Sequence, residues 1–93
     1  MRIRLRAELD PFYRDMGLWN RELASLIEQW RRHPEARTQL RGEFSRLKRA
    51  IEIGRNRALK RAEQIADGQP NSIWEDADRA SALLLRRLDE AMQ

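Results

Sequence analysis

Apolar residues recur every three or four positions through the first third of the chain. They are Phe12, Met16, Trp19, Leu23, Leu26 and Trp30. Residues at this spacing lie on one side of an α-helix and form a seam that packs against other helices. Asp10 and Pro11 suit an N-cap and a first helical residue, and Pro34 disfavours helical conformation at His33. We therefore predict a first helix over residues 11–32.

The middle of the chain keeps the same spacing and predicts a second, longer helix over residues 35–67, closed by Gly68. Its seam consists of Leu40, Phe44, Leu47, Ile51, Gly54, Ala58 and Ile65, with Ala62 beside them. At 1.5 Å per residue such a helix would be about 50 Å long. Gly42 and Gly54 each weaken a helix by roughly 1 kcal/mol relative to Ala, so either could mark a kink. The small residues Gly54, Ala58 and Ala62 would let a neighbouring helix approach closely.

A third helix is predicted over residues 72–92. Ser72 and Glu75 form a capping box at its start, and its apolar face consists of Trp74, Ala77, Ala80, Leu84, Leu88 and Ala91. With 93 residues, the chain is expected to form one all-α domain, a three-helix bundle with a long central helix. The flanking helices cannot cover the whole central seam. The central helix therefore breaks, or the N-terminal segment covers it, or another subunit does, and we expect a homo-oligomer or a subunit of a larger complex.

Residues 1–9 form an N-terminal arm whose conformation the pattern leaves open. Apolar residues alternate with Arg2, Arg4 and Arg6, which is the period of a half-buried strand. Leu5 and Leu9 also extend the helical spacing into the first helix, so strand, helix and disorder remain alternatives. A strand with arginines on one face would be similar to ribbon-helix-helix proteins. However, the turn after the first helix would then fall at Gly17–Asn20. The helix before it would span only Asp10–Met16, which is too short for the usual dimer core.

The sequence offers little that could perform catalysis, which requires nucleophiles or proton-transfer groups held in a pocket. The chain has no cysteine, and its single histidine, His33, lies in a predicted turn. The acidic residues Glu75, Asp76 and Asp78 suit the first turns of a helix, where the helix dipole favours negative charge. Trp19 and Trp30 lie on the apolar seam and are expected in the core. We therefore predict a protein that is not an enzyme and has no metal or cofactor.

Apolar runs are short, and the longest is Ala82–Leu85. A membrane span needs roughly 20 apolar residues, and the start of the chain lacks the continuous apolar stretch of a secretory signal. We therefore expect a cytoplasmic protein that does not enter a membrane.

Positive charge is concentrated in the second helix. Residues 36–61 contain nine basic and two acidic residues, a net charge of +7, whereas the rest of the chain contains ten basic and thirteen acidic residues, a net charge of −3. On a helical projection Arg37, Arg41, Lys48 and Arg55 lie beside the seam, close to Glu52. We expect these residues to lie along the core edge and form local ion pairs.

The cations opposite the seam have no acid among them and are the candidate binding residues. They are Arg46, Arg49, Arg57 and Lys60, with Arg61 next to them, and a secondary set comprises Arg2, Arg4, Arg6, Arg41, Lys48 and Arg55. A phosphate backbone would offset their mutual repulsion. We predict a non-specific contact with nucleic-acid backbone, directly or within a nucleoprotein complex. The alternatives are a solvated surface and a protein-binding module, such as a phage- or plasmid-type inhibitor, whose basic face docks on an acidic, nucleic-acid-binding surface of a partner.

Overall fold

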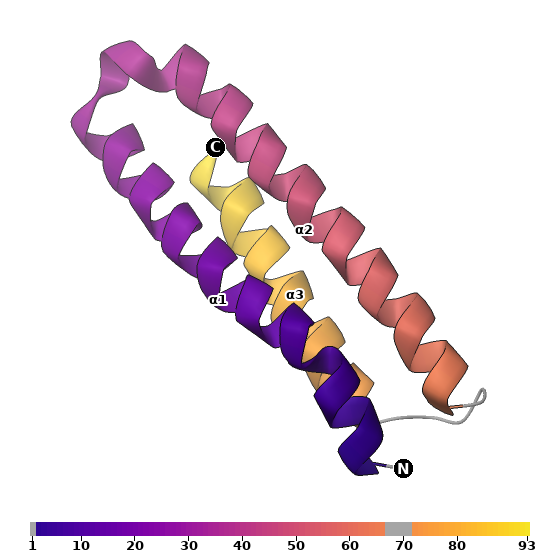
Figure 1. Ribbon diagram of the computed structural model, residues 1–93. Coiled ribbons are helices and arrows are strands. Elements are labelled where there is room, and N and C mark those ends of the chain that lie inside the picture. The colour runs from indigo at the N-terminus through magenta and orange to yellow at the C-terminus, as the bar shows by residue number, and fades with distance from the viewer. Residues whose placement is uncertain (1, 67–71) are drawn as a thin grey trace.

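The described part of the chain forms three α-helices, which confirms the predicted all-α arrangement (Figure 1). The computed structural model describes the backbone of residues 2–66 and 72–93 and the side chains of residues 9–64 and 74–93. The helices are α1 (Arg2–Arg32), α2 (Arg37–Ala66) and α3 (Ser72–Ala91). α1 and α2 form an antiparallel hairpin, and the shorter α3 packs along it and ends before the hairpin turn. The result is a rod of 50 × 17 × 15 Å.

The turn between α1 and α2 forms at His33-Pro34, where the sequence predicted a break between helices. α1 ends at Arg32 as predicted, and His33 leaves the helical region with φ −128° and ψ 72° ahead of Pro34. The second helix begins two residues later than predicted because Pro34–Ala36 form a 3₁₀ turn, in which the Ala36 N–H donates to the His33 carbonyl at 3.0 Å. The proposed closing residue Gly68 and the side chain of Ser72, on which the predicted capping box depends, lie outside the described residues.

The predicted start of the first helix is wrong. α1 begins at Arg2 and passes through Pro11, so Asp10 is not an N-cap and residues 2–9 are neither strand nor disordered. A proline inside a helix removes a hydrogen bond and costs about 3 kcal/mol. Leu9 offsets this cost because it is fully buried in a cluster with Ala62 of α2 and Ala77 of α3. The ribbon-helix-helix alternative is excluded with the strand.

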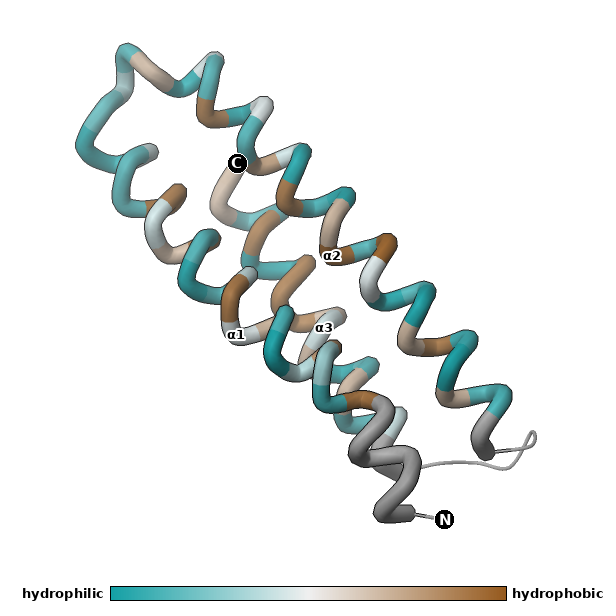
Figure 2. The backbone as a smooth tube through the Cα atoms, in the orientation of Figure 1, coloured by the Kyte–Doolittle hydropathy of each residue, from teal (hydrophilic) through white to brown (hydrophobic). Residues whose placement is uncertain are grey.

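Two apolar clusters form the core, and Trp19 packs against both of them. Hydrophobic positions recur along all three helices between hydrophilic ones (Figure 2). The cluster nearer the hairpin turn contains large side chains: Leu23, Leu26, Leu40, Phe44, Leu47, Ile51, Leu84 and Leu88. The other contains Leu9, Phe12, Met16, Ala58, Ala62 and Ala77. Between them the Trp19 ring lies directly on Gly54, where an added Cβ would overlap Cη2 and lie 3.1 Å from Cζ2. The small residues of α2 therefore allow the close helix approach that the sequence predicted.

The described part of the α2 seam, from Leu40 to Ala62, is covered within a single chain, and the side chain of Ile65 lies outside the described residues. α2 is one helix through both Gly42 and Gly54; the N-terminal turns of α1 reach its Ala58–Ala62 end, and α3 packs on its middle. The sequence left open whether the central helix breaks, the N-terminal segment covers its seam, or another subunit covers it. In the structure the N-terminal segment covers it. The described residues therefore do not require a second subunit to complete the core, and the expected oligomer stays a prediction.

Candidate nucleic-acid interface

Two cations of α2 next to the core are paired with carboxylates of α3. Lys48 Nζ lies 3.0 Å from Asp89 Oδ1, and Arg55 Nε lies 3.0 Å from Asp78 Oδ1. Both cations are partly buried, as their place beside the seam predicted. The expected partner Glu52 was wrong, because α3 packs against this side of α2 and brings its own acids closer. Lys48 and Arg55, both in the secondary set, therefore form ion pairs that connect α2 with α3.

Arg37 and Arg41 contact Trp30 at the hairpin turn instead of forming ion pairs with described residues. Their guanidinium carbons lie 4.8 and 5.7 Å from the centroid of the Trp30 ring. Arg37 Nε also donates to the Trp30 carbonyl oxygen at 3.2 Å, which satisfies one of the unpaired carbonyls at the end of α1. Trp30 packs edge-on against Phe44 at 5.7 Å. Arg41, another member of the secondary set, therefore belongs to the packing of the turn.

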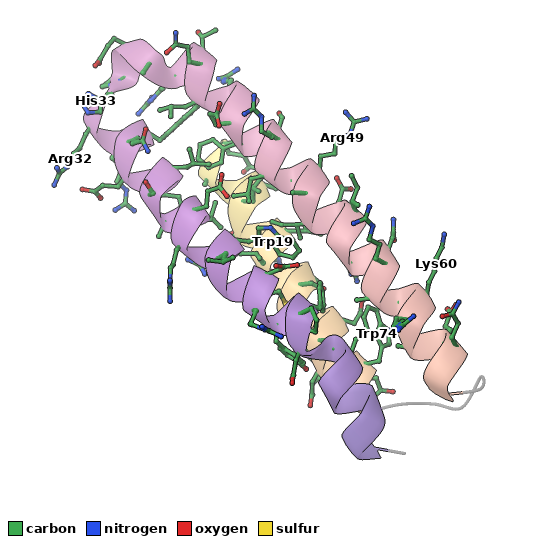
Figure 3. All side chains as sticks on the ribbon, viewed as in Figure 1. Trp19, Arg32, His33, Arg49, Lys60 and Trp74 are labelled. Carbon is green, nitrogen blue, oxygen red and sulfur yellow. The ribbon has the colours of Figure 1, made fainter. Side chains whose placement is uncertain are left out.

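The four cations opposite the seam are exposed, as predicted. Arg46 has an exposed side-chain fraction of 79% and lies 3.9 Å from Glu43, a distance at which a surface ion pair contributes little. Arg49, Arg57 and Lys60 form no hydrogen bond or ion pair with any residue that the structure describes. Figure 3 shows Arg49 and Lys60 pointing away from the other two helices. These four residues, Arg46, Arg49, Arg57 and Lys60, are called the outer row below.

Arg61 differs from the outer row. Together with Arg57 it lines a shallow groove of about 270 Å³ between α1 and α2, which Asp15 also borders. Arg61 takes part in an interaction within the protein. It therefore lies at the edge of the candidate interface, on the side facing α1.

Ile53 is a member of this surface that the sequence reading did not include. Its side chain is 46% exposed, and it lies four residues after Arg49 and four residues before Arg57. Positions four apart share one side of a helix, so this spacing was the available signal. The apolar side chain interrupts the outer row at its middle.

The tryptophans face the core. Trp19 and Trp30 pack on the main apolar cluster, which confirms their predicted place. Trp74 stacks on Phe12 with ring centroids 6.2 Å apart. Among the described residues, the outer side of α2 therefore presents no aromatic ring. The side chains of Arg2, Arg4 and Arg6 lie outside the described residues.

The remaining titratable residues are in small, exposed arrangements. His33 Nδ1 lies 3.0 Å from Glu35 Oε1 in the turn. The pKa of Glu35 is lowered by a hydrogen bond from its own backbone N–H and, to a smaller extent, by His33. The acidic cluster near the start of α3 is divided, since Asp76 pairs with Arg79 and Asp78 with Arg55. Across the described residues, no group of three or more His, Cys, Asp or Glu residues could hold a metal ion.

Comparisons with protein-family models, with curated protein sequences and with solved structures find no match to this chain. Within the described part of the chain, no helix combines the length and apolar character needed to cross a membrane. The outer side of α2 is therefore the surface from which a function can be argued.

Proposed function

We propose that the protein is a non-enzymatic nucleic-acid-binding protein that contacts phosphates with the outer side of α2. The contacting residues are Arg46, Arg49, Arg57 and Lys60, with Arg61 at the edge. Binding takes place directly or within a nucleoprotein complex. The observation behind this proposal is the exposed outer row, three of whose four cations have no partner among the described residues.

The contrast within α2 argues that the outer row serves a ligand. Like charges three and four residues apart on a helix repel one another. The chain places Asp78 and Asp89 against the cations beside the core. Among the described residues it provides the outer row with Glu43 alone, 3.9 Å from Arg46. Phosphates would relieve this repulsion and release condensed counterions. Arginine, which makes up three of the four residues, also binds phosphate through two parallel hydrogen bonds.

The outer row favours binding that is independent of base sequence. Phosphate contacts position a protein on nucleic acid but carry no direct sequence information. Four such contacts give a slope of log K against log salt of about −3.6 for a B-form duplex. Binding should therefore be strong at low salt and fall steeply as salt is added.

The proposal is tested by fluorescence anisotropy with labelled double- and single-stranded oligonucleotides at several salt concentrations. The variant Arg46→Ala/Arg49→Ala/Arg57→Ala/Lys60→Ala should lose at least 100-fold in affinity at low salt. A matched control, Arg14→Ala/Arg21→Ala/Arg79→Ala/Arg86→Ala, removes the same charge from α1 and α3 and should lose much less. Circular dichroism checks that both variants remain folded.

Two outcomes would contradict the proposal. Equal losses in the two variants would mean that net charge, and not the outer side of α2, determines binding. No binding to any oligonucleotide at low salt would leave an acidic protein surface as the better partner for the outer row.

A further inference from the structure

We infer that the ligand is a DNA duplex and that α2 lies across its major groove, with one half of the outer row on each phosphate backbone. This inference rests on the proposed function, since it specifies the nucleic acid that the outer side of α2 binds. It follows from the spacing of the cations and from the residues between them.

The outer row consists of two pairs separated by a gap. Arg46 and Arg49 form the first pair, and Arg57 and Lys60 form the second. Corresponding members are eleven residues apart, which is about three helical turns, so both pairs lie on the same side of α2, roughly 16 Å apart along its axis. Between them the only cation, Arg55, is turned inward to Asp78.

This spacing fits the major groove of B-form DNA. That groove is about 12 Å wide and admits an α-helix, whereas the minor groove is about 6 Å wide. Two pairs roughly 16 Å apart on a helix can therefore reach the phosphates on both walls of the major groove. They are too far apart for the two walls of the minor groove.

The residues between the two pairs of cations are better suited to the interior of the major groove than to contact with phosphates. Ile53 is 46% exposed there, and Ala50 is exposed one turn before it. An apolar side chain in the major groove can contact the methyl group of thymine. A strand running along α2 would instead place phosphates opposite these uncharged residues.

The aromatic residues argue against a single strand as the ligand. Proteins that bind single strands combine a basic groove with aromatic rings on which bases stack. In the described part of this chain, Trp19 and Trp30 pack on the core and Trp74 stacks on Phe12. Double-stranded RNA is a poorer fit because its major groove is deep and narrow.

The first test compares three ligands of one sequence: a 20-base-pair DNA duplex, its labelled single strand and the corresponding RNA duplex. At low salt the DNA duplex should bind at least tenfold more tightly than either of the others. Arg46→Ala/Arg49→Ala and Arg57→Ala/Lys60→Ala should each reduce the salt slope by about 1.8, since each removes two phosphate contacts. The control Arg14→Ala/Arg21→Ala removes the same charge from α1 and should leave the slope unchanged.

The second test determines whether both strands are contacted. One strand of the duplex is replaced by a strand with uncharged methylphosphonate linkages. Neutralising one strand doubles the spacing of the charges along the duplex, so each phosphate contact should contribute about −0.7 to the slope, as on a single strand, instead of about −0.9. If one pair of cations lies on each backbone, two contacts remain and the slope should be about −1.4. If all four cations follow one strand, the protein can choose the charged strand and the slope should be about −2.8.

The outcomes separate this inference from the proposed function. The inference would be overturned, and nucleic-acid binding left in place, if the single strand or the RNA duplex bound as tightly as duplex DNA. A slope of about −2.8 on the half-neutral duplex would overturn it as well. A lack of binding to all three ligands would overturn the proposed function and the inference together.

Discussion

Both sides of α2 carry basic side chains, but the two sides differ in the carboxylates that lie near these cations. Beside the core, Lys48 and Arg55 meet carboxylates of α3 at hydrogen-bonding distance. On the opposite side, Arg49 and Lys60 project into solvent without a partner among the described residues (Figure 3). On α2 the fold thus neutralises the two cations that it partly buries and leaves Arg49, Arg57 and Lys60 without a carboxylate partner among the described residues. A basic composition alone does not single out one surface of the protein; the proposed function rests on the side of α2 whose cations lack partners among the described residues.

The two sides of α2 also differ in the space available for an added side chain. Substitutions that test this difference should have the largest effect on the free energy of unfolding. Gly54→Ala on the inner side should destabilise the protein by about 1–3 kcal/mol, because the new methyl group overlaps the Trp19 ring. Gly42 has nothing within 4 Å of its added Cβ. Gly42→Ala should therefore stabilise the protein by roughly 0.5–1 kcal/mol through helix propensity. Urea denaturation followed by circular dichroism measures both, and shifts in the same direction would contradict the close packing at Gly54.

The next effect concerns the inner ion pairs. Asp78→Ala leaves the partly buried Arg55 without its carboxylate and should cost about 1 kcal/mol, a modest value because the side chains are 33% and 43% exposed. Asp76→Ala is the matched control, since it removes a nearby acid whose partner Arg79 is 77% exposed. That variant should change stability by less than about 0.5 kcal/mol. Equal losses would indicate that the pair between Asp78 and Arg55 contributes no more to stability than the exposed pair between Asp76 and Arg79.

A smaller effect is expected for the outer row. Arg49→Ala, Arg57→Ala and Lys60→Ala should each leave the free energy of unfolding within about 0.5 kcal/mol of the original, because their side chains have no described partner to lose. Each should still weaken nucleic-acid binding and reduce the salt slope by about 0.9. A loss of stability as large as that of Asp78→Ala would show that the outer row also belongs to the architecture of the bundle.

The smallest effect lies in the turn, away from both sides of α2. His33→Ala should raise the pKa of Glu35 only part of the way to its ordinary value, because the hydrogen bond from the Glu35 backbone N–H is the larger cause of the lowering. A lowered carboxyl pKa stabilises the folded state above the ordinary Glu pKa, and this contribution is lost as the pH falls through the lowered value. A carboxyl titration by NMR measures the pKa. Full recovery of the ordinary value in the variant would show that His33 is the main cause.

Much of the fold could be predicted because it depends on local spacing. The apolar positions predicted all three helices, and Pro34 fixed the end of α1 at Arg32. The division of the α2 cations into two groups also follows from helical geometry alone, as does the exposure of the outer row. Ile53 could have been recognised by the same rule, since it lies four residues from Arg49 and from Arg57.

The start of α1 could not be predicted from local signals because Asp10 and Pro11 resemble a helix start. The decision depends on Leu9, which is buried against residues about 50 and 70 positions further along the chain, Ala62 and Ala77. The covering of the α2 seam follows from the same extension.

Taken alone, the sequence determined the three helices, the apolar side of each and the side of α2 on which the outer row lies. These properties repeat with the helical period and need no knowledge of neighbouring elements. Only the tertiary structure decided that α1 continues to Arg2 and that Lys48 and Arg55 pair with α3. Such pairings depend on how the helices are aligned along one another. Close packing fixes that alignment, as where the Trp19 ring lies against Gly54.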